Sequence, residues 1–429
     1  MEQLRKGFKK TEVGVIPEDW EVTTLGEATS LVTNGFVGTA TTHYTEGRDG
    51  VLYIQGYNVI ANSFNFTGIK KVTSEFHKQH KKSSLREGDL LTIQTGDVGL
   101  TTIVPKELEG SNCHALIISR FLPTKANPKF YSQYFNSSIG RSRLKELETG
   151  TTMKHLNVGD MLYWKIPLPP NLTEQNAIAD ALSDVDALIA NLEKLIAKKK
   201  AIKQGAMQQL LTPPHKGGKR LEGFSGEWET VKLSDKIWFQ EGPGVRKYQF
   251  TTSGVKLLNG TNINDGKLDL STTDKYISSS EAYGSYKHFL VDEGDILIAC
   301  SGISIDKFDE KVTVSKTENL PLCMNTSTMR FKTKDGSVSR EYYYHFLKSV
   351  AFKKQIGGQA TGSAQLNFGP SHVTKVIMHL PPKEEQKTIA NILNDMDSEI
   401  RFFTNQLSKY NSIKQGMMQE LLTGKTRLI

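Results

Sequence analysis

The triplet Gly-Lys-Thr at 424–426 has the residue types of a phosphate-binding loop, in which backbone amides and a lysine hold a nucleotide. That motif needs another glycine five positions earlier, where Gln419 stands, and a strand before the loop. The Gly-Gly-Lys stretch at 217–219 lies in a linker rich in proline, glycine and lysine and fails for the same reasons. We therefore interpret the 424–426 triplet as the polar exit of a helix.

Other reactive patterns are also missing from the sequence. Each Pro-Pro pair continues with Asn171, His215 or Lys383, so the chain lacks the Asn/Asp-Pro-Pro-aromatic loop of amino-methyltransferases. The histidines never occur as HxxxH or HxH, and no nucleophile elbow of the form GxSxG is present. We expect a chain that performs no catalysis itself and that holds no metal and no cofactor.

Basic and polar loops are the stronger candidates for function. The formal net charge is +8 and is spread along the chain, which favours a polyanionic partner. In the first half, the densest basic group combines a Lys-Lys pair with the stretch FHKQHKK; its candidate phosphate contacts are Lys70, Lys71, Lys78, Lys81 and Lys82. A solvated charged face is the alternative reading of this group.

Three further segments carry candidate contacts. The glycine-rich loop GPGVRKYQFTTSG (242–254) places Arg246, Lys247 and Tyr248 ahead of an expected strand, where the cations could reach guanine edges or phosphates. Two loops rich in small and hydroxyl residues, 149–157 and 358–367, supply Lys154 and Gln365. These two loops are otherwise read as simple turns. A lysine cluster at 198–203 is interpreted as the outer face of a helix.

The elements that must position these loops are written twice. Residues 174–212 align with 385–423 at an offset of 211, and 18 of the 39 positions are identical, including Ile-Lys-Gln-Gly in both copies. Fainter similarity precedes each copy: VLYIQGYNV (51–59) resembles VKLLNGTNI (255–263), and EGDLLTI (87–93) resembles EGDILIA (293–299). The chain is therefore two half-molecules in tandem, each a variable domain followed by a near-constant segment.

The near-constant segments predict two long helices. Their apolar residues follow a 4–3 spacing, which is typical of a coiled-coil seam and is interrupted by Lys199 and Lys203 in the first copy and by Lys414 in the second. The seam residues that we select are Ile178, Leu182, Val185, Ile189, Leu192, Ile389, Leu393, Met396, Ile400, Phe403 and Leu407. A helix of about 37 residues is roughly 55 Å long.

The variable segments mix short β-branched or aromatic runs with one or two short helices, separated by turns such as EGD and NDG. The predicted fold class is α+β: two mixed α/β domains around twisted sheets, separated and joined by two long coiled-coil helices. The expected boundaries are 1–165 for the first domain, 166–223 for the first helical region and linker, 224–378 for the second domain and 379–429 for the second helical region.

Composition limits the location of the protein. The chain shows neither a secretory leader nor an apolar run of 18 residues, so we expect no membrane association. Three scattered cysteines without CxxC spacing fit a reducing cytoplasm.

Taken together, these segments resemble the specificity subunit of type I restriction-modification systems. The resemblance covers nearly the whole chain and rests on LPPNLTEQNAIADALSDVDALI and LPPKEEQKTIANILNDMDSEI, each followed by IKQGxMQxLLT, and on the W-E-x-x-x-L opening of each half. It implies two target-recognition domains that bind double-stranded DNA and are joined by two long antiparallel coiled-coil helices with pseudo-twofold symmetry. It also implies two methyltransferase subunits as partners, joined by motor-nuclease restriction subunits for cutting.

The same resemblance implies that the cofactors are on the partners: S-adenosylmethionine on the methyltransferase, and ATP and magnesium on the restriction subunit. Two other classes stay open from the sequence. One is an autonomous DNA-binding protein, and the other is a coiled-coil interaction protein with no role in nucleic-acid binding.

Overall fold

The computed structural model describes residues 5–151, 154–357 and 365–428. These residues form two compact units. The first unit comprises residues 1–193 with 405–429, and the second comprises 194–404. Each long helix is therefore divided between the units, because α6 (Leu172–Leu210) and α12 (Lys383–Leu421) each contribute residues to both.

A four-stranded antiparallel sheet lies at the centre of the first unit, in the order β4-β12-β9-β10. Its strands are β4 (Thr29–Asn34), β9 (Leu90–Ile93), β10 (Thr101–Ile103) and β12 (Leu116–Phe121). Side chains alternate across it: Leu90 and Ile117 join the core beneath the helices, whereas Leu91 and Ile118 join a core on the opposite face.

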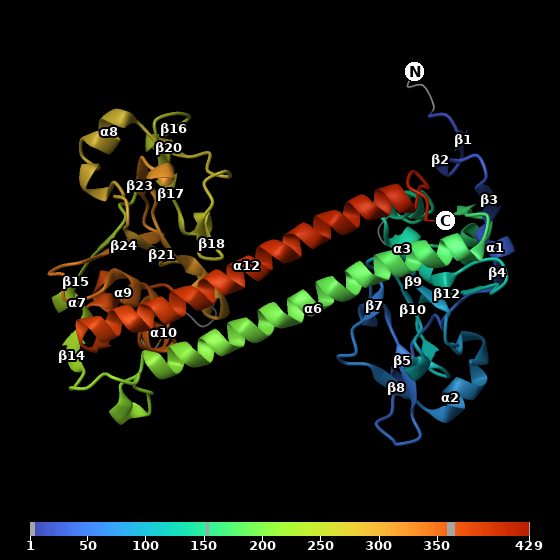
Figure 1. The fold of residues 1–429 in the computed structure, drawn as a ribbon, viewed down its shortest axis with the longest axis horizontal. Coiled ribbons are helices and arrows are strands. Elements are labelled where there is room, and N and C mark those ends of the chain that lie inside the picture. Colours follow the sequence, from blue (N-terminus) through green and yellow to red (C-terminus); the bar gives the residue numbers. More distant parts are fainter. Residues whose placement is uncertain (1–4, 152–153, 358–364, 429) are drawn as a thin grey trace. The chain divides into compact units, whose positions relative to one another are not determined.

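The opposite face is covered by a second, smaller sheet in the order β11-β5-β8, so that this sheet lies on the side away from α6 (Figure 1). Its strands are β5 (Val51–Ile54), β8 (Lys70–Val72) and β11 (Asn112–Cys113). The remaining elements are β1 (Phe8–Thr11), β2 (Gly14–Pro17), β3 (Glu21–Thr24), β6 (Val59–Ile60), β7 (Ser63–Phe64), β13 (Lys165–Leu168), α1 (Leu25–Ala28), α2 (Ser74–Gln79), α3 (Pro128–Asn136), α4 (Ser138–Glu146) and α5 (Val158–Tyr163).

The second unit repeats this plan. Its central sheet has the order β15-β24-β21-β22 and its smaller sheet the order β16-β20-β17-β23. The strands are β14 (Glu229–Lys232), β15 (Ile237–Glu241), β16 (Phe250–Thr251), β17 (Val255–Leu258), β18 (Ile263–Asn264), β19 (Lys267–Leu268), β20 (Tyr276–Ile277), β21 (Ile296–Ala299), β22 (Val312–Val314), β23 (Leu322–Met324), β24 (Thr328–Thr333) and β25 (Ile377–Leu380). The short helices are α7 (Leu233–Lys236), α8 (Ser279–Tyr283), α9 (Arg340–Leu347), α10 (Val350–Gly357) and α11 (Pro370–Val373).

The duplicated Glu-Gly-Asp motif shows why the two frames match. Its glycine adopts a left-handed conformation in both copies, with φ of +84° at Gly88 and +81° at Gly294. The aspartate that follows lies directly before a buried central strand, β9 or β21, and pairs with an arginine of the neighbouring strand. Arg120 Nε donates to Asp89 at 2.7 Å, and Arg330 Nη1 donates to Asp295 at 3.2 Å. The motif is thus a turn and a strand-to-strand ion pair at once.

In each unit, the start of one long helix and the end of the other share a hydrophobic core. In the first unit, Ile178 and Leu182 of α6 belong to the same cluster as Leu421 of α12. In the second unit, Ile389 and Leu393 of α12 join the cluster that contains Leu210 of α6. The two helices therefore run in opposite directions within each unit (Figure 1).

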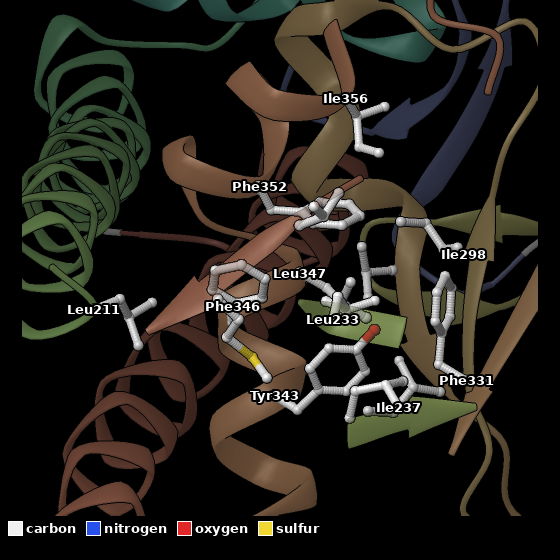
Figure 2. Packing of buried hydrophobic residues seen from close by; sticks show 14 of the residues in the cluster. Leu211, Leu233, Ile237, Ile298, Phe331, Tyr343, Phe346, Leu347, Phe352 and Ile356 are labelled. Carbon is white, nitrogen blue, oxygen red and sulfur yellow. The ribbon is translucent and has the colours of Figure 1, made fainter. Parts of the chain in front are cut away.

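Aromatic side chains fill the core of the second unit. Figure 2 shows Tyr343 of α9 and Phe331 of β24 turned toward Ile237. The two rings lie 6.0 Å apart, and Tyr343 is fully buried. Removing such side chains from water supplies most of the free energy that holds α9 against the sheet.

The lysines that interrupt the seam are paired with acidic residues of the facing helix. Lys203 Nζ donates to Asp397 Oδ1 at 2.5 Å in the second unit, and Lys414 pairs with Asp186 in the first. Lys203 corresponds to Lys414 and Asp186 to Asp397 at the offset of 211, so the same ion pair is built twice. Lys199 also pairs with a glutamate of the facing helix, Glu399, at 2.7 Å.

A second duplicated ion pair joins the start of each long helix to the segment that follows the other long helix. Arg427, which follows α12, donates through Nε to Glu174 Oε1 at 2.5 Å, and Arg220, which follows α6, donates to Glu385 Oε2 at 2.8 Å. Both glutamates are buried at the start of the opposite long helix, with 1% and 0% of their surface exposed. A buried carboxylate without a cation is costly, so each helix start requires the arginine that follows the other helix.

The predicted seam residues are buried to different degrees. Ile178, Leu182, Ile389 and Leu393 are fully buried, because they pack into the cores of the units. Val185, Ile189, Leu192, Met396, Ile400, Phe403 and Leu407 are half-buried. Two helices alone can cover only part of such an apolar stripe.

Among the described residues, none of the helices has the length and apolar character that a membrane crossing requires.

The ion pair at Glu174 makes a stability prediction. Arg427→Met leaves the Glu174 carboxylate buried without a cation and should destabilise the first unit by about 2–4 kcal/mol. The double variant Glu174→Gln/Arg427→Met should recover most of this loss, because a neutral amide needs no cation. Lys425→Met, an exposed neighbour, serves as the control. Hydrogen exchange of first-unit amides measures the effect; equal protection in all variants would contradict it.

Candidate nucleic-acid interface

Loops from both sheets of the first unit gather at one edge. The end of β4 pairs with the start of β12, and the end of β9 pairs with that same start. The smaller sheet adds the ends of β5 and β11, which pair Ile54 with Cys113. We call the resulting surface the first loop edge; it consists of residues 35–40, 55–58, 94–100, 113–115 and 149–151 with 154–156.

The second unit has a corresponding surface, the second loop edge. It consists of residues 242–245, 259–262, 300–304, 324–327 and 365–368, placed by the equivalent strand ends. A glycine permits close contact of two loops at each edge. A Cβ on Gly35 would lie 2.6 Å from the Cys113 carbonyl oxygen, and one on Gly242 would lie 2.3 Å from that of Asn325. Neither position tolerates a side chain without backbone movement.

Amides and hydroxyls stabilise the loops of the second loop edge. The Asn367 Oδ1 accepts from Ser301 Oγ at 3.0 Å and from the Gly302 backbone amide at 2.8 Å. Asn325 Nδ2 donates to Asn259 Oδ1 at 3.0 Å. One carboxylate, that of Glu241, lies at the end of β15, and its burial raises its pKa. The edge is therefore a rigid polar surface.

Two predicted residues fall on these edges. Lys154 lies at the first loop edge with 64% of its side chain exposed, and its ammonium is 3.1 Å from Glu148. Gln365 is exposed at the second loop edge, close to Gly302. Both lie beside the loop that follows a central strand, β9 or β21. Residues 152–153 and 358–364 of the same predicted loops lie outside the described residues.

The predicted basic group of the first half is divided between two edges of the smaller sheet. Lys70 and Lys71 are on β8, where successive side chains point to opposite faces. Lys78 lies on α2, and Lys81 and Lys82 lie in the turn that follows. That turn contacts β11 at the other edge, because α2 crosses the face of the sheet. All five except the half-buried Lys71 are exposed.

The predicted contacts of the second half lie beside the smaller sheet of the second unit. Arg246, Lys247 and Tyr248 form the turn that leads into β16 of the smaller sheet, and all three are exposed, Tyr248 by 86%. The sequence-based reading of the lysine cluster as an outer helix face is wrong for Lys203. That residue is 8% exposed and paired with Asp397, since it faces α12.

A family model described as the type I restriction modification DNA specificity domain matches this chain twice, at residues 17–204 and 225–413. The chain belongs to this family. It is a DNA specificity subunit of a type I restriction-modification system with two target recognition domains, and as such a non-catalytic component of that enzyme complex.

Relatives and solved structures agree along the full length. The type I restriction enzyme MjaVIII specificity subunit of Methanocaldococcus jannaschii is 26% identical over 432 residues, which cover 99% of this chain and 96% of the relative. The crystal structure of a type I restriction-modification S subunit from M. genitalium aligns with a TM-score of 0.58 at 15% identity, covering 98% of this chain and 97% of that one. A structure described under complex assembly and conformational transition of the type I R-M system aligns with a TM-score of 0.57 at 18% identity, covering 96% and 99%.

One cation of this specificity subunit was missed from the sequence. Lys275 lies two residues before Ile277, as Lys70 lies two before Val72, and the two strands pair with equivalent residues of β17 and β5. Both lysines are exposed, so the two recognition domains carry a cation at the same place. The faint similarity of the surrounding residues hid this correspondence.

The cysteines do not form a reactive site in the described part of the chain. Cys113, Cys300 and Cys323 are buried, and burial raises the pKa of Cys300 to about 12 and that of Cys323 to about 11. Thiols with a raised pKa are poor nucleophiles at neutral pH. No group of three or more metal-binding side chains occurs among the described residues.

The salt dependence of DNA affinity distinguishes a phosphate contact from a base contact. Lys70→Ala should weaken binding of the assembled complex evenly across sequences and reduce the slope of log affinity against log salt by about one, as loss of a phosphate contact does. Arg246→Ala should instead cost about 1–3 kcal/mol of specific binding if its guanidinium contacts a base edge. Lys106→Ala is the control, because this exposed lysine lies at the opposite end of the central sheet. Salt titrations in which Lys70→Ala and Lys106→Ala behave alike would remove Lys70 from the interface.

Proposed function

We propose that this specificity subunit reads a bipartite, asymmetric site on double-stranded DNA, with one recognition domain for each half-site. The observation that carries the proposal is the repetition of one frame with different exposed residues. Both units share the order of the central sheet, the Glu-Gly-Asp turns and the helix ion pairs, whereas the loop edges differ in sequence. A common frame with unlike loops is suited to two unlike half-sites.

The candidate contacts follow from this arrangement. Lys70, Lys71, Lys78, Lys81, Lys82 and Lys154 would serve the first half-site, and Arg246, Lys247, Tyr248 and Gln365 the second. Arginine and lysine would contact phosphates and guanine edges, and the amide would contact a base edge. The four segments 1–165, 166–223, 224–378 and 379–429 are proposed as the functional pieces of the chain.

We further propose that the two long helices hold two methyltransferase subunits. The Ile-Lys-Gln-Gly motif supports this assignment because it is kept in both copies, although the described structure of the chain gives its glycine no packing role. A Cβ on Gly205 or Gly416 would meet nothing within 4 Å. A glycine inside a helix costs about 1 kcal/mol relative to alanine, and close approach of a partner backbone explains such a residue.

The neighbouring isoleucine supports the same surface. Ile202 is 48% exposed and Ile413 is 39% exposed, at equivalent positions on the two helices. Two equivalent apolar surfaces on one chain predict two copies of one partner. The half-buried seam residues Val185, Ile189, Leu192, Met396, Ile400, Phe403 and Leu407 would be covered further in that complex.

Cofactors would then be divided among the subunits. S-adenosylmethionine would bind the methyltransferase partner, and ATP and magnesium would bind the restriction partner when it is present. This chain would hold none of them. Each 39-residue helix is about 58 Å long, and the pair would fix the gap between half-sites.

An autonomous DNA-binding protein is the second candidate. The exposed lysines at equivalent positions of the two domains favour DNA contact by the chain itself. Tight, sequence-specific binding by the isolated chain would support that alternative, and a requirement for methyltransferase would support the complex.

The partner surface can be tested by mass. Ile202→Glu and Ile413→Glu should each weaken one methyltransferase site by at least about tenfold, since an apolar side chain is lost from the contact. Native mass measurement should then show one empty and one occupied methyltransferase site for each single variant. It should show no occupied site for the double variant.

The matched control is Leu188→Glu. Leu188 is 37% exposed on α6, and its equivalent on α12 is Glu399, so the scaffold already accepts glutamate there. Leu188→Glu should retain two methyltransferase copies. Retention of both copies by the double isoleucine variant would refute the proposed surface.

A further inference from the structure

A buried asparagine fixes one turn at each loop edge. Asn58 Oδ1 accepts from the Gln55 backbone amide at 3.0 Å, and Asn262 Oδ1 accepts from the Asn259 backbone amide at 2.9 Å. Their Nδ2 groups donate to the carbonyls of Asn65 at 2.9 Å and Asp269 at 3.1 Å. Asn58 is 0% and Asn262 is 4% exposed. The turns after β5 and β17 are therefore the same rigid structure.

The residues of this turn divide into constant and different positions. The first turn reads Gln55-Gly-Tyr57-Asn and the second reads Asn259-Gly-Thr261-Asn. The glycine and the second asparagine build the turn in both units. The remaining two positions differ between the units, and Tyr57 and Thr261 are exposed. This is the division expected of a recognition element, in which constant residues position the ones that vary.

Neighbouring contacts orient the amide side chains. Gln55 Nε2 donates to the Tyr57 hydroxyl at 3.3 Å, and that hydroxyl donates to the Gly68 carbonyl at 2.8 Å. In the second unit, Asn325 Nδ2 donates to Asn259 Oδ1 at 3.0 Å. Each amide is half-buried, so it is held at the surface without being covered.

One lysine lies near each turn. Lys70 pairs in register with Tyr53, two residues before Gln55, and the Lys275 carbonyl accepts from the Leu257 amide, two residues before Asn259. Both lysines are exposed, as a phosphate contact requires. An oriented amide beside such a cation has the composition of a base-reading site, because a primary amide can donate to N7 and accept from N6 of one adenine.

We propose that Gln55 and Asn259 are specificity-determining residues, each of which reads an adenine edge in the major groove of its own half-site. Tyr57 is a positioning residue that orients the Gln55 amide. The inference rests on the proposed assignment of one recognition domain to each half-site.

The test uses the complete subunit assembled with its methyltransferase and a library of DNA sites with randomised half-sites. Gln55→Ala should reduce discrimination at one A·T pair of the first half-site by about 5- to 150-fold. Asn259→Ala should do the same in the second half-site only. Gln55→Glu should move the preference at that position toward cytosine, because a carboxylate accepts from cytosine N4.

One control variant and one variant of the positioning residue separate base contact from an effect on folding. Gln79→Ala removes an exposed amide at the end of α2 and should leave the preference unchanged. Tyr57→Phe should reduce the discrimination in part, since the amide loses its orienting hydroxyl. Methyltransferase binding and the preference in the other half-site should be unchanged in every variant.

Each other outcome overturns a stated part of the inference. An unchanged preference in Gln55→Ala and Asn259→Ala, or a weakening that is equal for all sequences, would show that the amides do not read bases. Loss of preference at a G·C pair would overturn the adenine assignment. Changes in both half-sites from one substitution would instead contradict the assignment of one domain to each half-site, while leaving base contact in place.

Discussion

Each unit of this protein depends on a buried carboxylate that only a residue far away in the chain can neutralise. Glu174 begins α6 and needs Arg427 from beyond the end of α12, while Glu385 begins α12 and needs Arg220 from beyond the end of α6. A glutamate with almost no exposed surface is unfavourable without its cation. The core of either unit is therefore complete only when both helices contribute their ends, and the rest of the structure is arranged around that requirement.

The seam aspartates, Asp186 and Asp397, are likewise each neutralised by a lysine of the other long helix, but their surroundings differ. Burial alone would raise the pKa of Asp397, yet Lys203 and Lys348 hold it below its usual value. Burial and the nearby Lys203 ammonium lower the pKa of His345 to about 4, so this imidazole is neutral at physiological pH and bonds to Asn394. In the first unit, Asp186 accepts instead from the Gln133 amide at 2.7 Å. One ion pair is thus supported by two different polar networks, each matched to its own domain.

Much of the architecture could be predicted from the sequence because it is written twice. The long helices and the mixed domains follow from the 4–3 spacing and from the repeat, and the family resemblance supplied the antiparallel direction of the helices. In the sequence, Lys203 and Lys414 look like interruptions of the apolar seam. Their aspartates stand 194 and 228 positions away, and no local pattern links them. The proposed recognition surface was only partly predictable. Lysine density pointed to Lys70, whereas Gln55 looks like an ordinary residue after a strand until the buried Asn58 shows that its turn is rigid.

In the proposed arrangement, two recognition domains act independently on one shared scaffold, and the methylated sequence of host DNA tests that claim most directly. Residues 224–378 would be replaced by the corresponding domain of a relative, which keeps both long helices and their ion pairs. Mapping methylated adenines across the host genome should then show a new second half-site, with the first half-site and the spacer unchanged. A change in both half-sites, or a change of spacer without a change of bases, would contradict the account.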